Sequence, residues 1–151
     1  MTDMIIRNAC KDDMPELIAG SLRFHEAMLK QKTLTFDPDS AKKLMMFLIG
    51  SPAALVLVME MKKSIVGAIG GFLSPWMLDW RIKIMTEFFW WLNEERRGSG
   101  IRLLIEFERL AKIKGADRMI MVTLQQDDET LARYYERRGY KHLEHHFIKE
   151  I

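Results

Sequence analysis

The segment NEERRGSGIRLLIEFERLAKIKGADRMIMV, residues 93–122, is the most informative part of this sequence. Two arginines, two glycines and a serine come early in it, and from Ile101 onward apolar residues recur at helical spacing. Gly115 stands where the C-cap of such a helix belongs, and the apolar run that follows predicts a buried strand. The segment therefore predicts a glycine loop, an amphipathic helix and a strand in succession.

The residues before this loop, IMTEFFWWLN at 84–93, predict an aromatic strand with Glu87, Phe89 and Trp91 on one face. Further strands are expected at 4–8, 53–61, 65–75 and 118–124, with a closing strand at 140–150. Further helices are expected from a capping box at Asp13 to Leu29, from a cap at Asp39 or Ser40 to about Gly50, and at 127–138. This order predicts a mixed α/β domain rather than a symmetric doubly wound sheet.

Composition narrows the class of protein. The chain has 151 residues, 48% of them hydrophobic, so we expect one core and a single domain over residues 1–151. A net charge of +2 is too small to indicate nucleic-acid binding, and the single cysteine, Cys10, excludes an internal disulfide. The first residues are polar and acidic where a signal peptide would be apolar, and no apolar run has membrane-spanning length. We therefore expect a cytoplasmic protein that engages neither nucleic acid nor a membrane.

The glycine loop itself has two interpretations. A strand, a flexible loop and a helix N-terminus together present unpaired backbone N–H groups and the positive end of the helix dipole, which suits a phosphate. The same residues would also serve a tight turn between strand and helix. The neighbouring arginines favour the anion site, and the spacing matches neither the loop of nucleotide triphosphatases nor that of dinucleotide-binding folds.

The whole chain resembles the GNAT superfamily of N-acetyltransferases, and it looks like a small stand-alone member. The resemblance lies in the element order and in four phrases: VLVMEMKKSIVGAIGG, EFFWWLNEERRGSG, IRLLIEFERLAKIKGA and LARYYERRGY. It implies an α/β fold with a central mixed, mostly antiparallel sheet flanked by about four helices. It also implies acetyl-CoA as cosubstrate and direct acetyl transfer to a primary amine of a small molecule or peptide through a ternary complex.

In that family the loop receives the pyrophosphate of acetyl-CoA on a pattern of Arg or Gln, two residues, Gly, one residue, then Gly or Ala. Gly98 and Gly100 can take the two small-residue places, which leaves Glu95 at the first. Alternatively Arg97 and Gly98 form the Arg-Gly pair, which leaves Arg102 at the last place. The coenzyme-binding residues that the resemblance implies are Leu92, Arg96, Arg97, Gly98, Ser99, Gly100, Ile101 and Arg102.

The resemblance also implies two catalytic side chains. LARYYERRGY places Tyr135 where many members keep the phenol that faces the coenzyme sulfur, with Tyr134 as its competitor. Glu87 lies on the strand that leads into the loop, where such enzymes often carry a carboxylate base. Its aromatic neighbours would desolvate it and raise its pKa, although a carboxylate that simply points to solvent is an equally good interpretation. Backbone N–H groups of this strand would polarise the thioester carbonyl.

The sequence defines the residues that would bind the acceptor amine less well. We assign Phe36, Trp76 and Trp91 to substrate binding, and ordinary packing explains such aromatic residues nearly as well. His142, His145 and His146 match no known ligand spacing, so no metal site is predicted. The alternatives to an enzyme are a catalytically degenerate GNAT-fold module for binding or assembly and, less favoured by the charge, a nucleic-acid-binding domain. The expected partner is an amine, with a homodimer as a further possibility.

Overall fold

Five strands form one mixed sheet in a computed structural model that describes residues 3–28, 33–96, 98–123 and 128–151. The strands are β1 (Met4–Asn8), β2 (Ala54–Met61), β3 (Ser64–Trp76), β4 (Asp79–Leu92) and β5 (Arg118–Ile120). They lie in the order β1-β2-β3-β4-β5, and neighbours are antiparallel except β4 and β5, which are parallel. The predicted mixed and mostly antiparallel sheet is confirmed.

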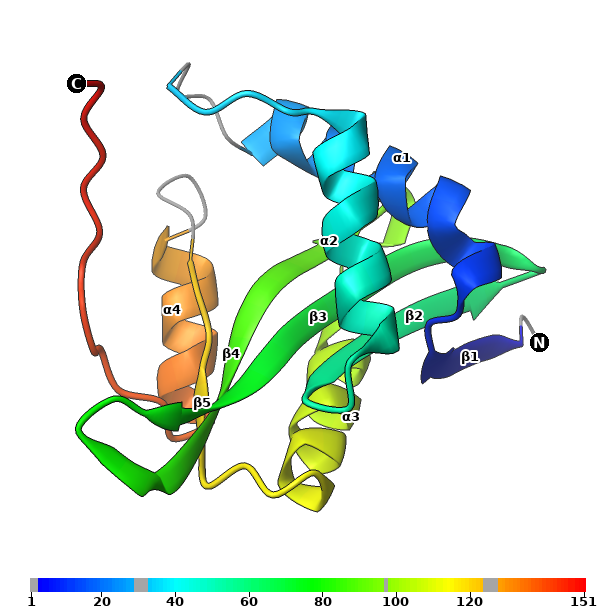
Figure 1. The fold of residues 1–151 in the computed structure, drawn as a ribbon. Helices are drawn as coiled ribbons and strands as arrows, with labels where there is room; N and C mark the ends of the chain where they lie inside the picture. Colours follow the sequence, from blue (N-terminus) through cyan, green and yellow to red (C-terminus); the bar gives the residue numbers. More distant parts are fainter. Residues whose placement is uncertain (1–2, 29–32, 97, 124–127) are drawn as a thin grey trace.

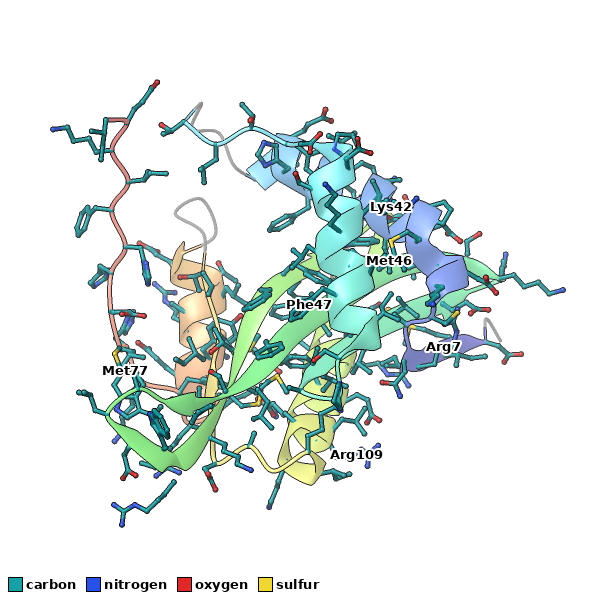
Figure 2. All side chains as sticks on the ribbon, in the orientation of Figure 1. Arg7, Lys42, Met46, Phe47, Met77 and Arg109 are labelled. Atoms are coloured by element: carbon teal, nitrogen blue, oxygen red, sulfur yellow. The ribbon has the colours of Figure 1, made fainter. Side chains whose placement is uncertain are left out.

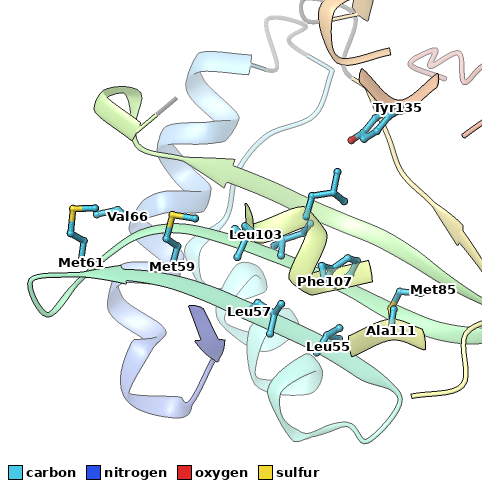
Figure 3. Close-up of a cluster of buried hydrophobic side chains, with 12 residues drawn as sticks. Leu55, Leu57, Met59, Met61, Val66, Met85, Leu103, Phe107, Ala111 and Tyr135 are labelled. Atoms are coloured by element: carbon cyan, nitrogen blue, oxygen red, sulfur yellow. The ribbon is translucent and has the colours of Figure 1, made fainter. Parts of the chain in front are cut away.

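Helices cover both faces of this sheet (Figure 1). They are α1 (Met14–Met28), α2 (Pro38–Gly50), α3 (Gly100–Ile113) and α4 (Asp128–Arg137). One buried cluster joins α1 and α2 to the sheet through side chains such as Leu17 and Leu48. The other joins α3 and α4 to the opposite face, with Phe107 and Tyr135 among its buried members (Figure 3). Burial of large apolar side chains on both faces explains why β2 reads as a continuous apolar run.

The starts of the first two helices differ from the expected caps. Asp13 ends a 3₁₀ turn, Lys11–Asp13, and its carboxylate accepts a hydrogen bond from the Cys10 amide at 2.8 Å. It also forms a paired contact with Arg7, with both distances at 2.8 Å, which holds the pKa of Asp13 below its ordinary value. Helix α2 is capped by Asp37, whose carboxylate accepts from the Ser40 amide at 2.9 Å. The cap precedes the expected position because Pro38 already occupies the first turn.

A β-bulge in β4 changes which way its side chains point. Gly70 pairs with Phe89 and Gly71 pairs with Glu87, so Phe88 is the extra residue. Phe89 and Trp91 pack in the core on the α1 and α2 side. Glu87 follows Met85 by two residues on the α3 and α4 side instead. The prediction that Glu87 shares a face with Phe89 and Trp91 is wrong, because one inserted residue reverses the alternation.

The expected connection at residues 76–83 is a hairpin in the structure, because β3 continues to Trp76 and β4 begins at Asp79. The predicted strand at 118–124 is shorter, since only Arg118–Ile120 pair with β4 and Leu124 lies outside the described residues. The predicted closing strand at 140–150 is also wrong. These residues follow α4 with no strand hydrogen bonding, because no strand of the described chain lies against them.

None of the helices in the described ranges combines the length and apolar character that a bilayer crossing requires.

Candidate active site

The site is a cleft that opens where β4 and β5 separate. The two strands pair only at Ile84, Met85 and Thr86, so the edge of β4 beyond Thr86 has no described strand beside it. A cavity of about 1400 Å³ fills the gap. Its walls come from α1, the second half of β4, the glycine loop with the start of α3, and α4. A cleft at a point where parallel strands part is a usual place for a ligand.

Glu87 stands at the base of this cleft and is almost fully buried, with 9% of its surface exposed. Its carboxylate accepts a hydrogen bond from the Val122 amide at 3.0 Å. Desolvation raises the pKa of Glu87 to about 7, and the hydrogen bond only partly opposes that rise. A carboxyl group with such a pKa exchanges protons near neutrality, which is what a general base needs.

Of two adjacent tyrosines of α4, Tyr134 lines the cleft, whereas Tyr135 packs in the core beside it and does not line it. Tyr135 is buried, and its hydroxyl donates to the Val122 carbonyl oxygen at 3.4 Å, so Val122 links it to Glu87. Burial, together with the charge of Glu87, raises the pKa of Tyr135 well above its ordinary value and keeps the phenol protonated. The hydroxyl of Tyr134 is also buried, lines the cavity and has no hydrogen-bond partner among the described residues.

A polar cluster around Glu108 fixes the end of α4 against α3. Glu108 accepts hydrogen bonds from the Arg138 guanidinium and from the Tyr140 hydroxyl, the latter at 2.7 Å. The amide of Tyr140 also donates to the Tyr135 carbonyl oxygen at 3.0 Å. Tyr134 and Tyr135 are therefore held by a helix that one carboxylate anchors at its end.

The loop between β4 and α3 is partly folded on itself. After the 3₁₀ turn Glu94–Arg96, the amides of Arg96, Ser99 and Arg102 donate to main-chain oxygens three residues earlier. Gly98, Gly100 and Ile101 all line the cavity, and none of their amides donates to a main-chain oxygen in the described turns and caps. The loop thus presents main-chain donors at a helix N-terminus, fewer than an entirely open loop would offer.

The two glycines of the loop are required for different structural reasons. Gly98 has a φ of +99°, a left-handed conformation that favours glycine, and open space where a Cβ would lie. Gly100 is tightly packed instead, since a Cβ there would lie 2.3 Å from a methyl carbon of Leu92. Gly98 therefore leaves room for a ligand, whereas Gly100 lets α3 approach β4.

The predicted coenzyme residues divide between the cleft and its surroundings. Leu92, Gly98, Gly100 and Ile101 line the cavity, while Arg96 and Ser99 lie in the loop without lining it. Arg102 borders a separate shallow depression beside β1, and Arg97 lies outside the described residues. Arg102 turns away because two residues along a helix correspond to about 200° of rotation from Gly100.

The predicted acceptor residues are not brought together. Trp91 lines the cavity and packs against α1 at Gly20, where an added Cβ would lie 2.1 Å from the indole. Phe36 packs against the ring of His25, with centroids 5.8 Å apart, and does not line the cavity. Trp76 lies at the end of β3 in the hairpin, also away from it.

The structure adds residues that sequence reasoning missed. Arg23 of α1 lines the cleft, donates to the Asn93 side chain at 3.0 Å and lies over the Trp91 ring at 5.9 Å. Trp90 lines the cleft on the side of Tyr135, and its indole Nε1 is buried without a partner among the described residues, as is that of Trp91. Of these residues, only Trp90 and Trp91 had a signal in the sequence, as an aromatic pair in a predicted strand. The position of Arg23 had none, because nothing in the sequence indicates that α1 crosses β4 here.

A sheet that opens between β4 and β5, with a glycine loop beside the opening, agrees with the family comparison. The family model described as acetyltransferase (GNAT) family matches residues 21–140. The chain belongs to the GNAT family. The predicted resemblance is confirmed, and no curated protein matches the sequence.

Solved structures share the GNAT fold over nearly the full chain. A transcriptional regulator from Bacillus halodurans is similar with a TM-score of 0.79 and 18% identity, covering 99% of this chain and 100% of its own. A predicted acetyltransferase with acetyl-CoA from Clostridium acetobutylicum has a TM-score of 0.78 and 12% identity, covering 98% and 96%. An aminoglycoside acetyltransferase from an uncultured soil metagenomic sample, in complex with trehalose, has a TM-score of 0.72 and 18% identity, covering 98% and 96%. At these identities the likeness shows the fold, which is confirmed as that of GNAT acetyltransferases.

The described residues contain no cluster of three or more histidine, cysteine or acidic side chains arranged to hold a metal ion.

Proposed function

We propose that this GNAT protein is an acetyl-CoA-dependent N-acetyltransferase that acts on a primary amine of a small molecule or peptide. The observation that carries the proposal is the buried carboxylate of Glu87, which lines an open cleft and is linked through Val122 to the phenol of Tyr135 in the adjoining core. Acetyl-CoA supplies the acyl group as a thioester. We propose direct transfer in a ternary complex, in the cytoplasm, by a single domain over residues 1–151.

The residues present fit the coenzyme. The main-chain amides of Gly98 and Ile101 suit a diphosphate at the N-terminus of α3. Trp90 and Trp91 also line the cleft, and each indole Nε1 is a buried donor without a partner among the described residues. Leu92, Ser99 and Gly100, with Arg96, Arg97 and Arg102 nearby in sequence, complete the proposed coenzyme set.

Glu87 acts in this proposal as the general base. An alkylamine has an ordinary pKa near 10.4 and is mostly protonated at neutral pH, so it must lose a proton before its lone pair can attack. Glu87 takes this proton from the ammonium group, and the freed lone pair then forms the C–N bond as the C–S bond breaks. The second proton that the nitrogen loses balances the one that the departing thiolate gains. With its pKa raised to about 7, the carboxylate is a stronger base than an exposed glutamate.

Tyr135 acts as the general acid. Its phenol is protonated at neutral pH and would donate a proton to the departing thiolate. A thiolate with an ordinary pKa near 8.5 is already a tolerable leaving group, so this donation assists the reaction without being essential. Phe36, Trp76 and Trp91 remain the proposed acceptor residues, of which Trp91 has the support of lining the cleft.

The acceptor is proposed only as an amine. An aminoglycoside acetyltransferase shares the fold, which supports a small cationic acceptor without selecting one. Thiol release from acetyl-CoA, measured over a panel of aminoglycosides, polyamines, amino acids and peptides, tests the activity. Release that depends on one amine class supports the proposal. No release with any amine, in a protein that binds the coenzyme, contradicts it.

A catalytically degenerate GNAT-fold module is the second candidate. Its support is the loop, in which three amides bond internally and Arg102 turns away from the cleft. A transcriptional regulator also shares the fold. Calorimetric titration with acetyl-CoA separates the two: heat of binding at micromolar concentration supports the enzyme, and its absence supports the module.

A further inference from the structure

Three aromatic side chains form a row across the α1 and α2 face of the sheet. Phe47 projects from α2 over the sheet, as Figure 2 shows, and the centroid of its ring lies 5.8 Å from that of Phe72 on β3. The Phe72 ring in turn lies 6.4 Å from that of Phe88 on β4. The interplanar angles are 19° and 13°, so the rings are nearly parallel. These three residues are the aromatic row.

Both ends of the aromatic row are exposed. Phe47 has 57% and Phe88 has 50% of its surface exposed, whereas Phe72 between them is partly covered. Leu44, one helical turn before Phe47, is also 40% exposed. A single exposed phenylalanine is ordinary, but aligned rings make a continuous apolar surface of the kind that marks a ligand or partner site.

The bulge in β4 leaves one end of the row at the cleft. Because Phe88 is the extra residue, Phe88 and Phe89 both turn to the α1 and α2 face. Phe89 packs in the core there, and Phe88 stays at the free edge of the strand, where it lines the cavity. Bulges beside active sites commonly re-aim a side chain in this way.

The row enters the cleft on the side away from the proposed coenzyme. The glycine loop and Tyr134 of α4 line one side of the cavity, and residues of α1 such as Phe24 and Glu26 line the other. These sides correspond to the two faces of the sheet, which α3 with α4 and α1 with α2 cover separately. A coenzyme held at the glycine loop therefore leaves the α1 and α2 side for the acceptor.

We propose that the aromatic row selects the acceptor, so that the acetylated amine carries an aromatic or similarly flat apolar group that lies against Phe88. This inference rests on the proposed acetyl transfer and names the class of its acceptor. Glu87 and Phe88 are consecutive, with Cα atoms about 3.8 Å apart, so an amine at the free edge of β4 can contact both. Contact between aromatic rings stabilises beyond the burial of their area.

The rest of the wall fits the two ends of such a molecule. The carboxylate of Glu26 lines the same side of the cavity and suits a cationic nitrogen. Phe72 and Phe47 continue the apolar surface away from Glu87 for a larger group. A free arylalkylamine and a peptide whose first residue is aromatic share this chemistry.

The first test compares paired acceptors in thiol release from acetyl-CoA. 2-Phenylethylamine should have a kcat/KM about ten-fold or more above that of ethanolamine, which lacks the ring. A peptide that begins with phenylalanine is compared with the same peptide beginning with serine, and a preference in only one pair identifies the source of the acceptor. If neither pair favours the ring, the inference is overturned while acetyl transfer itself stands.

Variants assign the preference to the row. Phe88→Ala should lower the ratio of kcat/KM between 2-phenylethylamine and ethanolamine about five-fold or more, and Phe47→Ala, at the far end, should lower it less. The ratio does not depend on the fraction of folded enzyme. Phe147→Ala is the matched control, because this exposed phenylalanine does not line the cavity, and it should keep the ratio. An unchanged ratio in Phe88→Ala overturns the proposal.

A binding measurement tests the row without turnover. In saturation-transfer NMR with 2-phenylethylamine, the ring protons should receive more saturation than the methylene beside the nitrogen, and Phe88→Ala should reduce it. If no amine supports thiol release, the proposed acetyl transfer fails, and this result alone decides whether the row binds a ring. Equal signals in wild type and Phe88→Ala overturn the inference.

Light scattering tests the other occupant of such a surface, a second copy of the chain. The mass in solution should be the same for the wild type, Phe47→Ala and Phe88→Ala. A dimer that either variant converts to a monomer would make the row an interface between copies and overturn its role in acceptor selection.

Discussion

The two halves of β4 belong to one strand but have different surroundings. From Ile84 to Thr86 the strand is paired on both edges, by β3 and by β5. From Glu87 to Leu92, β3 is its one partner among the described strands, and the other edge faces the cleft. The paired half serves stability, and the half with one free edge carries the buried carboxylate and the indoles. The bulge at Phe88 lies at their junction.

The largest effect on ligand binding is expected where the second half of β4 meets the glycine loop. Gly98→Asp should raise the dissociation constant of acetyl-CoA at least a hundred-fold, about 3 kcal/mol, in calorimetric titration. The new carboxylate would stand beside the diphosphate, in a left-handed backbone conformation that disfavours a side chain.

Gly115→Asp is its matched control. Gly115 has a similar φ of +101° and equally open space, but it lies at the other end of α3. Equal loss of binding in both variants would mean that the substitutions act through the stability of α3 and not through the proposed coenzyme site.

The buried carboxylate predicts a pH-dependent stability. The pKa of Glu87 is about 7 in the folded protein, above its ordinary 4.5, so the folded state binds more protons between these values. Its contribution is fully present below pH 4.5 and is lost as the pH rises through 7. The free energy of unfolding should therefore fall by about 3 kcal/mol over this range relative to Glu87→Gln.

Urea unfolding at a series of pH values measures this difference. Acetyl transfer should rise with pH about an apparent pKa near 7 and be largely lost in Glu87→Gln. Glu106→Gln is the control, because this carboxylate of α3 lies outside the cleft and pairs with Arg109. Parallel stability curves for the wild type and Glu87→Gln would contradict the burial of charge at Glu87.

The bulge at the junction between the two halves of β4 depends on the absence of a side chain at Gly71. An added Cβ would lie 2.4 Å from the main-chain oxygen of Thr86, which cannot move aside as a flexible side chain can. Gly71→Ala should lower the free energy of unfolding by about 2 kcal/mol in denaturant titration. Gly50→Ala, with no atom within 4 Å of its added Cβ, should be near neutral. An unchanged Gly71→Ala would mean that the strands separate freely at the bulge.

The smallest effect is expected at the phenol. Tyr135→Phe should lower kcat about ten-fold, about 1.4 kcal/mol, and leave coenzyme affinity nearly intact. Its matched variant is Tyr134→Phe, which removes the neighbouring hydroxyl that lines the cleft without a partner among the described residues. If Tyr134→Phe lowers kcat and Tyr135→Phe does not, the proton donor is Tyr134.

Local features were the ones that the sequence could predict. The spacing of apolar residues after Ile101 predicted α3, and Gly115 ends it as expected, with the positive φ of a C-cap. The aromatic neighbours of Glu87 made a desolvated carboxylate one of two equal interpretations, and the structure shows the desolvated one. Each of these depends on residues close together in the chain, and therefore leaves a readable pattern.

Features that depend on distant partners were missed. The bulge at Phe88 arises opposite Gly70 and Gly71 of another strand, and alternation within β4 gives no sign of it. Residues 141–151 have the pattern of a strand, but a pattern reports side-chain preference and cannot supply a neighbour. The roles of Tyr135 and of the loop stay predictions, because they concern a ligand.

The polar cluster around Glu108 has a consequence for how the helices can move. Since Arg138 and Tyr140 are both tied to α3, the two helices that border the coenzyme side should move as one unit. Helix α1 forms the opposite wall; Glu16 near its start accepts from the Ile65 amide of β3 at 2.8 Å, and Arg23 near its end donates to Asn93 beyond β4. We therefore expect a ligand that widens the cleft to displace the Arg23 end of α1, while α3 and α4 keep their relative positions.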